Sequence, residues 1–249
     1  MGQCAALAFV ILLSLTGRAS SEDGDDSLMT PLRIAVAANF KPVVDELAEA
    51  FSSSRKISIS SGSTGALTAQ IKNGAPYDIF LAADVQRPEY LEKLGLTRMR
   101  QTYAFGRLAF WHPSMRPVGT ADLTELSTSI AIANPRHAPY GRAAEHLLVI
   151  TGNYKSKRIK GNNVAQAFSF VQTGNVDAGL VALSQLRHKD IEKKAYWVIP
   201  ADLHPPIEQQ AVIMRDANKI AESFLLFMGS TQARRIIQDA GYTLVNNLD

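Results

Sequence analysis

The chain alternates short apolar runs with stretches whose apolar residues recur at helical spacing. Strand-like runs cover residues 33–37, 57–60 and 78–82, and a second series begins with runs at 130–133 and 178–182. Helical spacing follows several of them, as in Val43, Val44, Leu47, Ala50 and Phe51 after the first run. Repeated strand–helix units predict parallel sheets with helices on both faces.

Two longer apolar segments join the two series. Residues 103–111 read as one long strand between them, and residues 209–214 as another that returns before the final predicted helices, 217–228 and 231–240. We therefore expect an α/β fold of two lobes, each a mostly parallel sheet flanked by helices, with a two-strand hinge. The predicted first lobe comprises 32–104 and 213–249, and the second lobe 105–212.

Small polar residues open a helix at four places along the chain. The openings are residues 38–40, 60–65, 139–141 and 161–164. A helix start presents unpaired backbone N–H groups and the positive end of the helix dipole, both of which attract anions. Each opening alone is ordinary helix capping. Ligands of open parallel sheets bind at the carboxyl ends of strands, where all four openings lie, so together they indicate a pocket for a small oxyanion.

The composition is that of an ordinary globular protein with nearly balanced charge. The 249 residues are 46% hydrophobic and 20% charged, with 26 Lys and Arg against 23 Asp and Glu. The compact basic run at 155–160 is expected in a solvated loop after the helix that ends near Ile150. A nucleic-acid surface needs a broader basic stripe with aromatic residues, so we expect no nucleic-acid partner.

The sequence lacks the common motifs of catalysis and metal binding. It contains no GxxxxGK[ST] loop, no HExxH and no Cys/His set at metal-ligand spacing. The segment Gly62–Gly65 is not the GxSxG of a nucleophile elbow, because two residues rather than three separate its glycines. We expect no enzyme. A serine hydrolase that uses Ser63 with one of the scattered histidines remains the alternative from another class.

The first residues predict export. The apolar run 5–15 is too short to span a bilayer, and Gly17-Arg18-Ala19 followed by a polar stretch suits signal peptidase, although no Lys or Arg precedes the run. We expect a signal peptide at 1–19, a flexible mature N-terminus at 20–31 and a periplasmic location. Cleavage would remove Cys4, the only cysteine, and with it any disulfide.

Six segments resemble one known family in sequence order. They are Ala37-Ala38-Asn39-Phe40, Ser61-Gly62-Ser63-Thr64-Gly65, residues 70–80, residues 134–141, Asn162-Asn163-Val164 and residues 206–213, and the closing Ala240-Gly241-Tyr242 extends the match. On these segments the chain is similar to the periplasmic molybdate-binding proteins of ABC transporters, from Leu32 to Val245. The resemblance implies the type II periplasmic-binding fold.

The resemblance also implies the ligand contacts. It places them at Asn39, Thr64, Tyr140 and Val164, with Ala38 and Ser63 adjacent. Asn39 would donate through its side-chain amide and backbone N–H, Thr64 through its hydroxyl and N–H, and Tyr140 and Val164 through backbone N–H. No cofactor is implied, and molybdenum enters only as bound molybdate.

The function implied is capture of molybdate, and of tungstate, for delivery to an ABC transporter permease in the inner membrane, by a protein that acts as a monomer. A binding protein for another tetrahedral oxyanion, such as sulfate, is the nearest alternative. A cytoplasmic ligand-sensing domain of the same fold is a third, but the chain has an apolar leader where an effector segment would sit.

Overall fold

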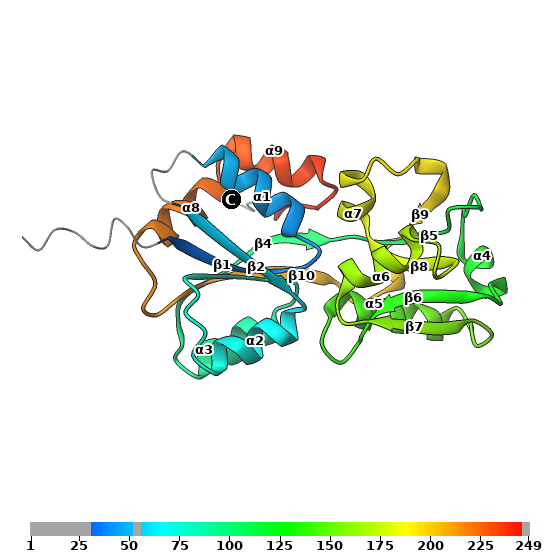
Figure 1. The fold of residues 1–249 in the computed structure, drawn as a ribbon, viewed down its shortest axis with the longest axis horizontal. Coiled ribbons are helices and arrows are strands. Elements are labelled where there is room, and N and C mark those ends of the chain that lie inside the picture. Colours follow the sequence, from blue (N-terminus) through cyan, green and yellow to red (C-terminus); the bar gives the residue numbers. More distant parts are fainter. Residues whose placement is uncertain (1–30, 52–55, 246–249) are drawn as a thin grey trace, which may run out of the picture.

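Two five-stranded sheets organise the chain in a computed structural model that describes residues 31–51 and 56–245 (Figure 1). The predicted signal peptide 1–19 and nearly all of segment 20–31 lie outside the described residues. The first sheet has the order β2-β1-β3-β10-β4 and the second β7-β6-β8-β5-β9. The strands are β1 (Leu32–Ala37), β2 (Ile57–Gly62), β3 (Ile79–Ala82), β4 (Thr97–Gly106), β5 (Leu108–Trp111), β6 (Ser129–Ala133), β7 (Lys157–Gly161), β8 (Ala178–Ala182), β9 (Tyr196–Val198) and β10 (Ile207–Met214).

The two sheets repeat one pairing scheme. In the first, β1 is parallel to β2 and β3, and β10 is antiparallel to β3 and β4. In the second, β6 is parallel to β7 and β8, and β5 is antiparallel to β8 and β9. Each lobe thus has a parallel core extended by antiparallel strands, which confirms the predicted two-lobed α/β fold.

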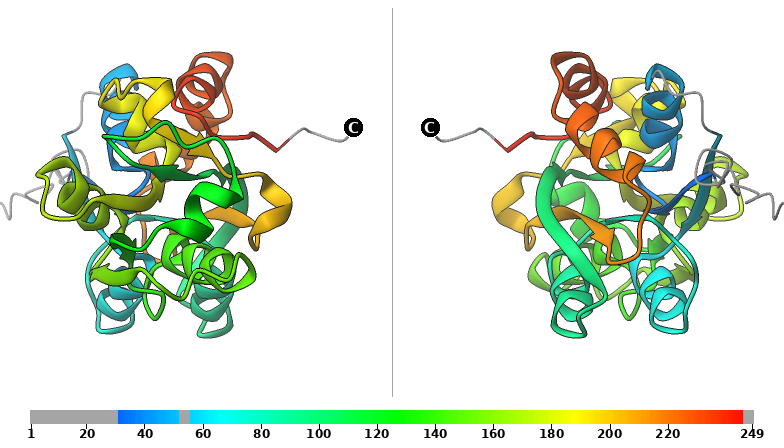
Figure 2. Two further views of the ribbon diagram at one scale, coloured as in Figure 1. Left: turned by 90° about the vertical axis from the view of Figure 1, so that its right-hand side faces the viewer. Right: turned by 90° about the vertical axis from the view of Figure 1, so that its left-hand side faces the viewer.

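Helices cover both faces of each sheet, as the end-on views in Figure 2 show. In the first lobe, α1 and α9 lie on one side and α2 and α3 on the other; in the second, α5 and α6 pack on opposite faces of β6. The helices are α1 (Lys41–Ala50), α2 (Thr64–Lys72), α3 (Gln86–Lys93), α4 (Thr120–Glu125), α5 (Pro139–Ile150), α6 (Val164–Gln172), α7 (Leu183–His188), α8 (Ile220–Met228) and α9 (Thr231–Asp239), with 3₁₀ turns at Lys193–Ala195 and Ala201–Leu203.

The chain crosses between the lobes twice, from β4 to β5 and from β9 to β10. The prediction of one strand over 103–111 is wrong, because Arg107 separates β4 from β5 and the two belong to different sheets. Gly106 is the last residue of β4, directly before the crossing. Only glycine fits there, because a Cβ would collide with the Tyr140 hydroxyl and the Gln209 amide. In the first sheet, the pairing of β4 with β10 includes Gly106, the last residue of β4, opposite Ile207, the first residue of β10. The lobe boundaries at 104/105 and 212/213 stay predictions.

Most of the basic run 155–160 is a strand rather than the expected loop, since only its first two residues lie in a bend. Residues Lys157–Gly161 form β7, the edge strand of the second sheet, paired in parallel with β6. Lys157 and Lys160 are exposed while Ile159 is partly buried against the core. Lysines on an edge strand hinder pairing with another chain, which gives the run a role in solubility.

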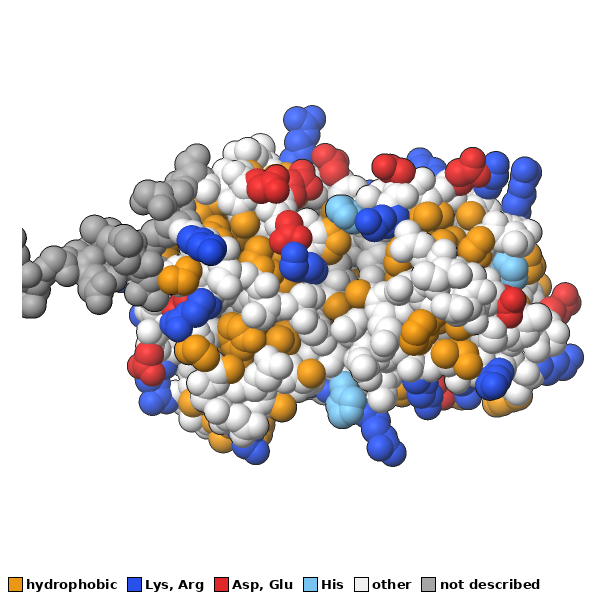
Figure 3. Space-filling model, in the orientation of Figure 1, with side chains coloured by type: hydrophobic (Ala, Val, Ile, Leu, Met, Phe, Trp, Pro, Cys, Tyr) orange, Lys and Arg blue, Asp and Glu red, His pale blue; other side chains and the backbone are white. Residues whose placement is uncertain are grey.

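None of the helices within 31–51 and 56–245 combines the length and apolarity needed to cross a bilayer. On the face in Figure 3, Lys and Arg side chains are interspersed with Asp and Glu over both lobes.

Candidate functional site

A small cavity lies between the two lobes. The first lobe contributes the ends of β1 and β2 with the residues that follow them, and the second contributes the starts of α5 and α6. The lining residues are Ala37, Ala38, Asn39, Gly62, Ser63, Thr64, Ala83, Ala138, Pro139, Tyr140, Asn163 and Val164. All six residues expected at the ligand are therefore brought together around one cavity.

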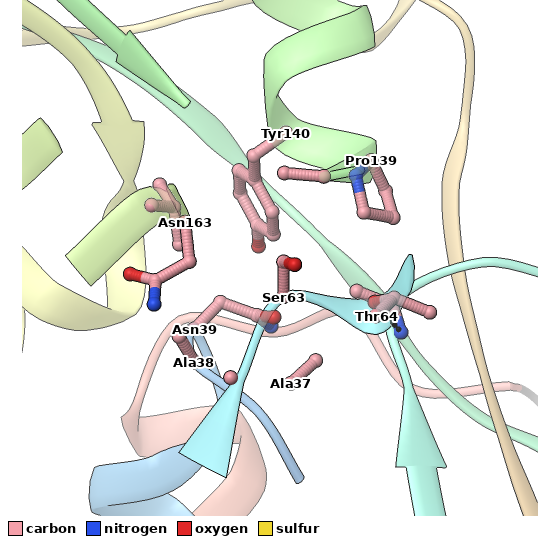
Figure 4. Close-up of a pocket in the computed structure, with 12 residues that line it drawn as sticks. Ala37, Ala38, Asn39, Ser63, Thr64, Pro139, Tyr140 and Asn163 are labelled. Atoms are coloured by element: carbon pink, nitrogen blue, oxygen red, sulfur yellow. Dashed lines mark hydrogen bonds between the residues drawn. The ribbon is translucent and has the colours of Figure 1, made fainter. Parts of the chain in front are cut away.

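The four helix openings singled out in the sequence meet at this cavity. Figure 4 shows Asn39, Ser63 and Thr64 approaching from one side and Tyr140 and Asn163 from the other. α2 begins at Thr64 with Ser63 as its N-cap, and α6 begins at Val164 with Asn163 as its N-cap. α5 begins at Pro139, where a missing N–H costs nothing. Their dipoles direct partial positive charge to the same space.

Backbone donors line the cavity without protein partners. Among the hydrogen bonds of the described residues, none uses the N–H of four cavity-lining residues: Asn39, Thr64, Tyr140 and Val164. A buried N–H without an acceptor costs about 1–3 kcal/mol. A ligand that offers several acceptors would remove that cost at several groups together.

Two hydroxyls add donors. Thr64, 1% exposed, accepts at Oγ1 from the N–H of Ala83 at 3.2 Å. Ser63 accepts at Oγ from the N–H of Ala66 at 3.3 Å. Because each oxygen only accepts in these bonds, each hydroxyl proton is free to point at a ligand.

The Asn39 side chain differs from the expectation. Its Nδ2 donates to Gln209 Oε1 and to Tyr242 Oη, both at 3.0 Å, so both amide protons are used inside the protein. Only the backbone N–H of Asn39 remains for the cavity. The side chain instead fixes the turn that presents this N–H.

A cluster of buried tyrosines lies behind the cavity. Burial raises the pKa values of Tyr103, Tyr140 and Tyr242 well above the usual range, so all three phenols keep their protons. Tyr103 Oη donates to Gln209 Oε1 at 2.7 Å. Among the described residues, Tyr140 Oη and Gln209 Nε2 are buried without hydrogen-bond partners, and both lie against Gly106. In Figure 4 the Tyr140 oxygen points toward the space between Ser63 and Asn39.

No Lys, Arg, Asp or Glu is among the described residues that line the cavity. The nearest charges along the chain follow Ala83: Asp84 pairs with Arg87 of its own lobe and with Arg142 of α5, the latter at 2.8 Å. One carboxylate faces two guanidinium groups, so this cluster keeps one net positive charge beside the cavity. No cluster of three or more His, Cys, Asp or Glu suited to a metal ion occurs in the described part of the chain.

The lobes also touch beside the cavity. The N–H of Gly65 donates to the carbonyl of His137 at 2.9 Å, and Arg87 Nη2 donates to the carbonyl of Arg136 at 3.3 Å. Together with Asp84–Arg142, these contacts connect α2 and α3 to the start of α5. The structure is therefore that of the closed form, with the lobes in contact around the cavity.

The whole two-lobed unit matches one family model, that of the bacterial extracellular solute-binding proteins, over residues 32–243. The chain belongs to this family. The matched residues of this solute-binding protein include both sheets and all four helix starts. They therefore include every residue that lines the cavity.

Two relatives and one solved structure are similar to most of the chain. The solute-binding protein is 39% identical over 227 residues to the molybdate-binding protein ModA of Azotobacter vinelandii, covering 86% of this chain and 90% of the relative. It is 34% identical over 220 residues to that of Rhodobacter capsulatus, covering 84% and 86%. The solved periplasmic molybdate-binding protein of Azotobacter vinelandii superposes with a TM-score of 0.80 at 35% identity, covering 86% of this chain and all of that one.

Sequence reasoning missed part of the site. Asn163 and Ala83 line the cavity, and Gln209, Tyr242 and Ser184 form the hydrogen-bonded support behind it. The signal for Asn163 was its place as an N-cap. For Gln209 the signal was weak, because it lies in a run of three polar residues, Glu208 to Gln210, at the start of β10, and only the fold shows that it is completely buried.

Proposed function

We propose that this solute-binding protein captures molybdate, and tungstate, in the periplasm and delivers it to an ABC transporter permease. The observation that carries the proposal is a cavity between the lobes that is lined by unpaired donors and by no charged side chain. Its relatives at 39% and 34% identity are named for molybdate. The ligand is bound and released unchanged by a monomer, without a cofactor, after removal of residues 1–19.

A lining rich in hydrogen-bond donors would favour a fully deprotonated anion over phosphate. A fully deprotonated tetrahedral dianion has only acceptors, which the free N–H and hydroxyl groups satisfy. Phosphate near neutral pH keeps a proton, and a lining without an acceptor would leave that O–H unpaired at a cost of about 1–3 kcal/mol. We assign the contacts to the N–H groups of Asn39, Tyr140 and Val164, to the N–H and hydroxyl of Thr64 and to the Tyr140 phenol, whose oxygen points toward the cavity, with Ala38 and Ser63 adjacent.

The hydrolase alternative finds no support in the hydrogen bonds of the described residues. Ser63 Oγ accepts from a backbone N–H, and no histidine is bonded to it. A nucleophilic serine needs a base within hydrogen-bond reach.

A panel of oxyanions tests the proposal. Molybdate and tungstate, at a hundredfold excess over the dissociation constant, should each stabilise the mature protein by about 2.7 kcal/mol through mass action. Calorimetric titration gives the constants. If sulfate or phosphate bound more strongly than molybdate, the assignment of molybdate as the ligand would be wrong.

Replacing Tyr140 by Phe should weaken molybdate binding about tenfold without lowering the melting temperature of the empty protein. Within the described residues the buried hydroxyl makes no hydrogen bond of ordinary geometry, although it lies beside Gln209 and Tyr242, so its removal should cost the empty protein little, whereas a hydrogen bond to a charged ligand is worth about 1.5–3 kcal/mol. Titration and thermal unfolding measure the two effects. Unchanged affinity would mean that the phenol only packs.

Replacing Gly65 by Ala should weaken binding about five- to tenfold by pressing the lobes apart. A Cβ at Gly65 would lie 3.0 Å from the carbonyl oxygen of His137 in the other lobe, and such overpacking opposes closure. The matched control is Gly119→Ala, since a Cβ there meets no atom of the described residues within 4 Å. Equal affinities of the two variants would show that closure tolerates the methyl group.

A further inference from the structure

Helix α7 of the second lobe docks on the first lobe behind the cavity. Ser184 and Arg187, one turn apart on α7, both reach across. Ser184 Oγ donates to the carbonyl oxygen of Asn39 at 2.9 Å. Arg187 Nη1 donates to the carbonyls of Gln238 and Asp239, at 3.3 and 2.9 Å, at the C-terminus of α9. One face of α7 is thus the contact between the lobes on this side.

Two hydroxyls from different lobes meet at a single carbonyl. Tyr242 Oη, from the first lobe, lies 2.8 Å from the carbonyl oxygen of Asn39 and 3.0 Å from Ser184 Oγ. All three residues are buried, with 1%, 5% and 3% of Asn39, Tyr242 and Ser184 exposed. Because Tyr242 also accepts from Asn39 Nδ2, it holds this residue whatever the position of the second lobe.

The same helix is tied to the crossing between the lobes. The N–H of Leu183, the first residue of α7, donates at 3.0 Å to the carbonyl of Arg107, the single residue between β4 and β5. A rotation of the lobes at this crossing therefore moves α7 with the second sheet. Since Ser184 moves with the second sheet and Asn39 belongs to the first lobe, opening of the lobes would change the separation of these two residues.

We propose that Ser184 is a positioning residue for the ligand: closure brings its hydroxyl onto the Asn39 carbonyl and so locks the turn that presents the Asn39 N–H to the cavity. The inference rests on the proposed function. Two other residues act beside Ser184. Tyr242 holds Asn39 in both the open and the closed form, and Arg187 of the second lobe donates to the last carbonyls of α9.

The physical consequence is a link between closure and binding. A bond made only in the closed form stabilises that form relative to the open one, and a ligand held by the closed form then dissociates more slowly. The bond contributes nothing to the fold of either lobe alone. Removing it should change ligand affinity and leave the stability of the empty protein unaltered.

The test is Ser184→Ala in the mature protein, with molybdate as the probe. The dissociation constant should rise about three- to tenfold, as expected for the loss of one hydrogen bond, through a faster dissociation rate. The melting temperature without ligand should stay at the parent value. The Asn39 carbonyl keeps Tyr242 as a donor, so the variant leaves no buried acceptor unpaired.

The matched control is Ser156→Ala. Ser156 is also a buried serine of the second lobe, but its hydroxyl donates to Asn153 Oδ1 within that lobe, at 2.5 Å. Its removal should lower the melting temperature and leave the affinity unchanged. The opposite patterns of the two variants separate positioning from a purely structural role.

Tyr242→Phe provides a second measurement. Ser184 and Tyr242 donate to one carbonyl, so the affinity loss of the double variant should differ from the product of the two single losses. Ser184→Ala with parental affinity, or with the Ser156→Ala pattern, overturns the proposal. If the parent protein itself does not bind molybdate, the proposed function fails, and that result is distinct from either outcome.

Discussion

Replacing Thr64 by Val should weaken molybdate binding ten- to a hundredfold. Val keeps the branched shape but lacks the hydroxyl, whose proton is free while its oxygen accepts from the N–H of Ala83. A hydrogen bond to a charged group is worth about 1.5–3 kcal/mol, which gives this range. Calorimetric titration of the parent and the variant measures it.

Thr64→Ser is the matched control, because it keeps the hydroxyl and removes only a methyl group. Its affinity should stay within about threefold of the parent. If Thr64→Val binds as tightly as Thr64→Ser, the hydroxyl does not contact the ligand, and Thr64 contributes through its N–H alone.

Replacing Asn39 by Asp should abolish binding, with an affinity loss of more than about a thousandfold. The change keeps the size of the side chain but adds a negative charge beside a cavity that otherwise has no charged lining. Two unit charges 4 Å apart repel by about 4 kcal/mol near a protein surface, and the ligand carries two charges. Titration at neutral pH detects the loss.

The variant Asn39→Ala separates the effect of an added charge from the effect of losing the hydrogen bonds that hold residue 39 in place. It removes the amide bonds to Gln209 and Tyr242 without adding charge, so we expect a smaller loss, of about ten- to a hundredfold, and a lower melting temperature. If Asn39→Asp and Asn39→Ala both bind molybdate like the parent, the ligand lies elsewhere.

The candidate site could be found in the sequence because its signal is local. A polar residue at a strand end followed by helical spacing marks a helix start, and four such starts converge at the cavity. The support behind it could not be found this way. The bonds of Asn39 join residues 145, 170 and 203 positions apart, and no local pattern records such separations. The direction of the Asn39 amide depends entirely on these distant partners.

The errors in the fold have local physical reasons. β7 is an edge strand, and its lysines point to solvent, so it lacks the apolar run by which buried strands are recognised. The break at Arg107 is invisible because the residues on both sides favour strands and continue as strands in different sheets. The close approach of Tyr140 and Gln209 to Gly106 at this crossing, which leaves no room for a Cβ, is likewise absent from any local pattern.

The uncharged lining has a consequence for the molecule as a whole. A dianion that binds gives the loaded protein two more negative charges than the empty one, and because no Lys or Arg lines the cavity this charge is met there by dipoles rather than by a paired cation. The two forms should therefore migrate differently in native electrophoresis, and a partner protein that is sensitive to surface potential meets a different electric field after capture.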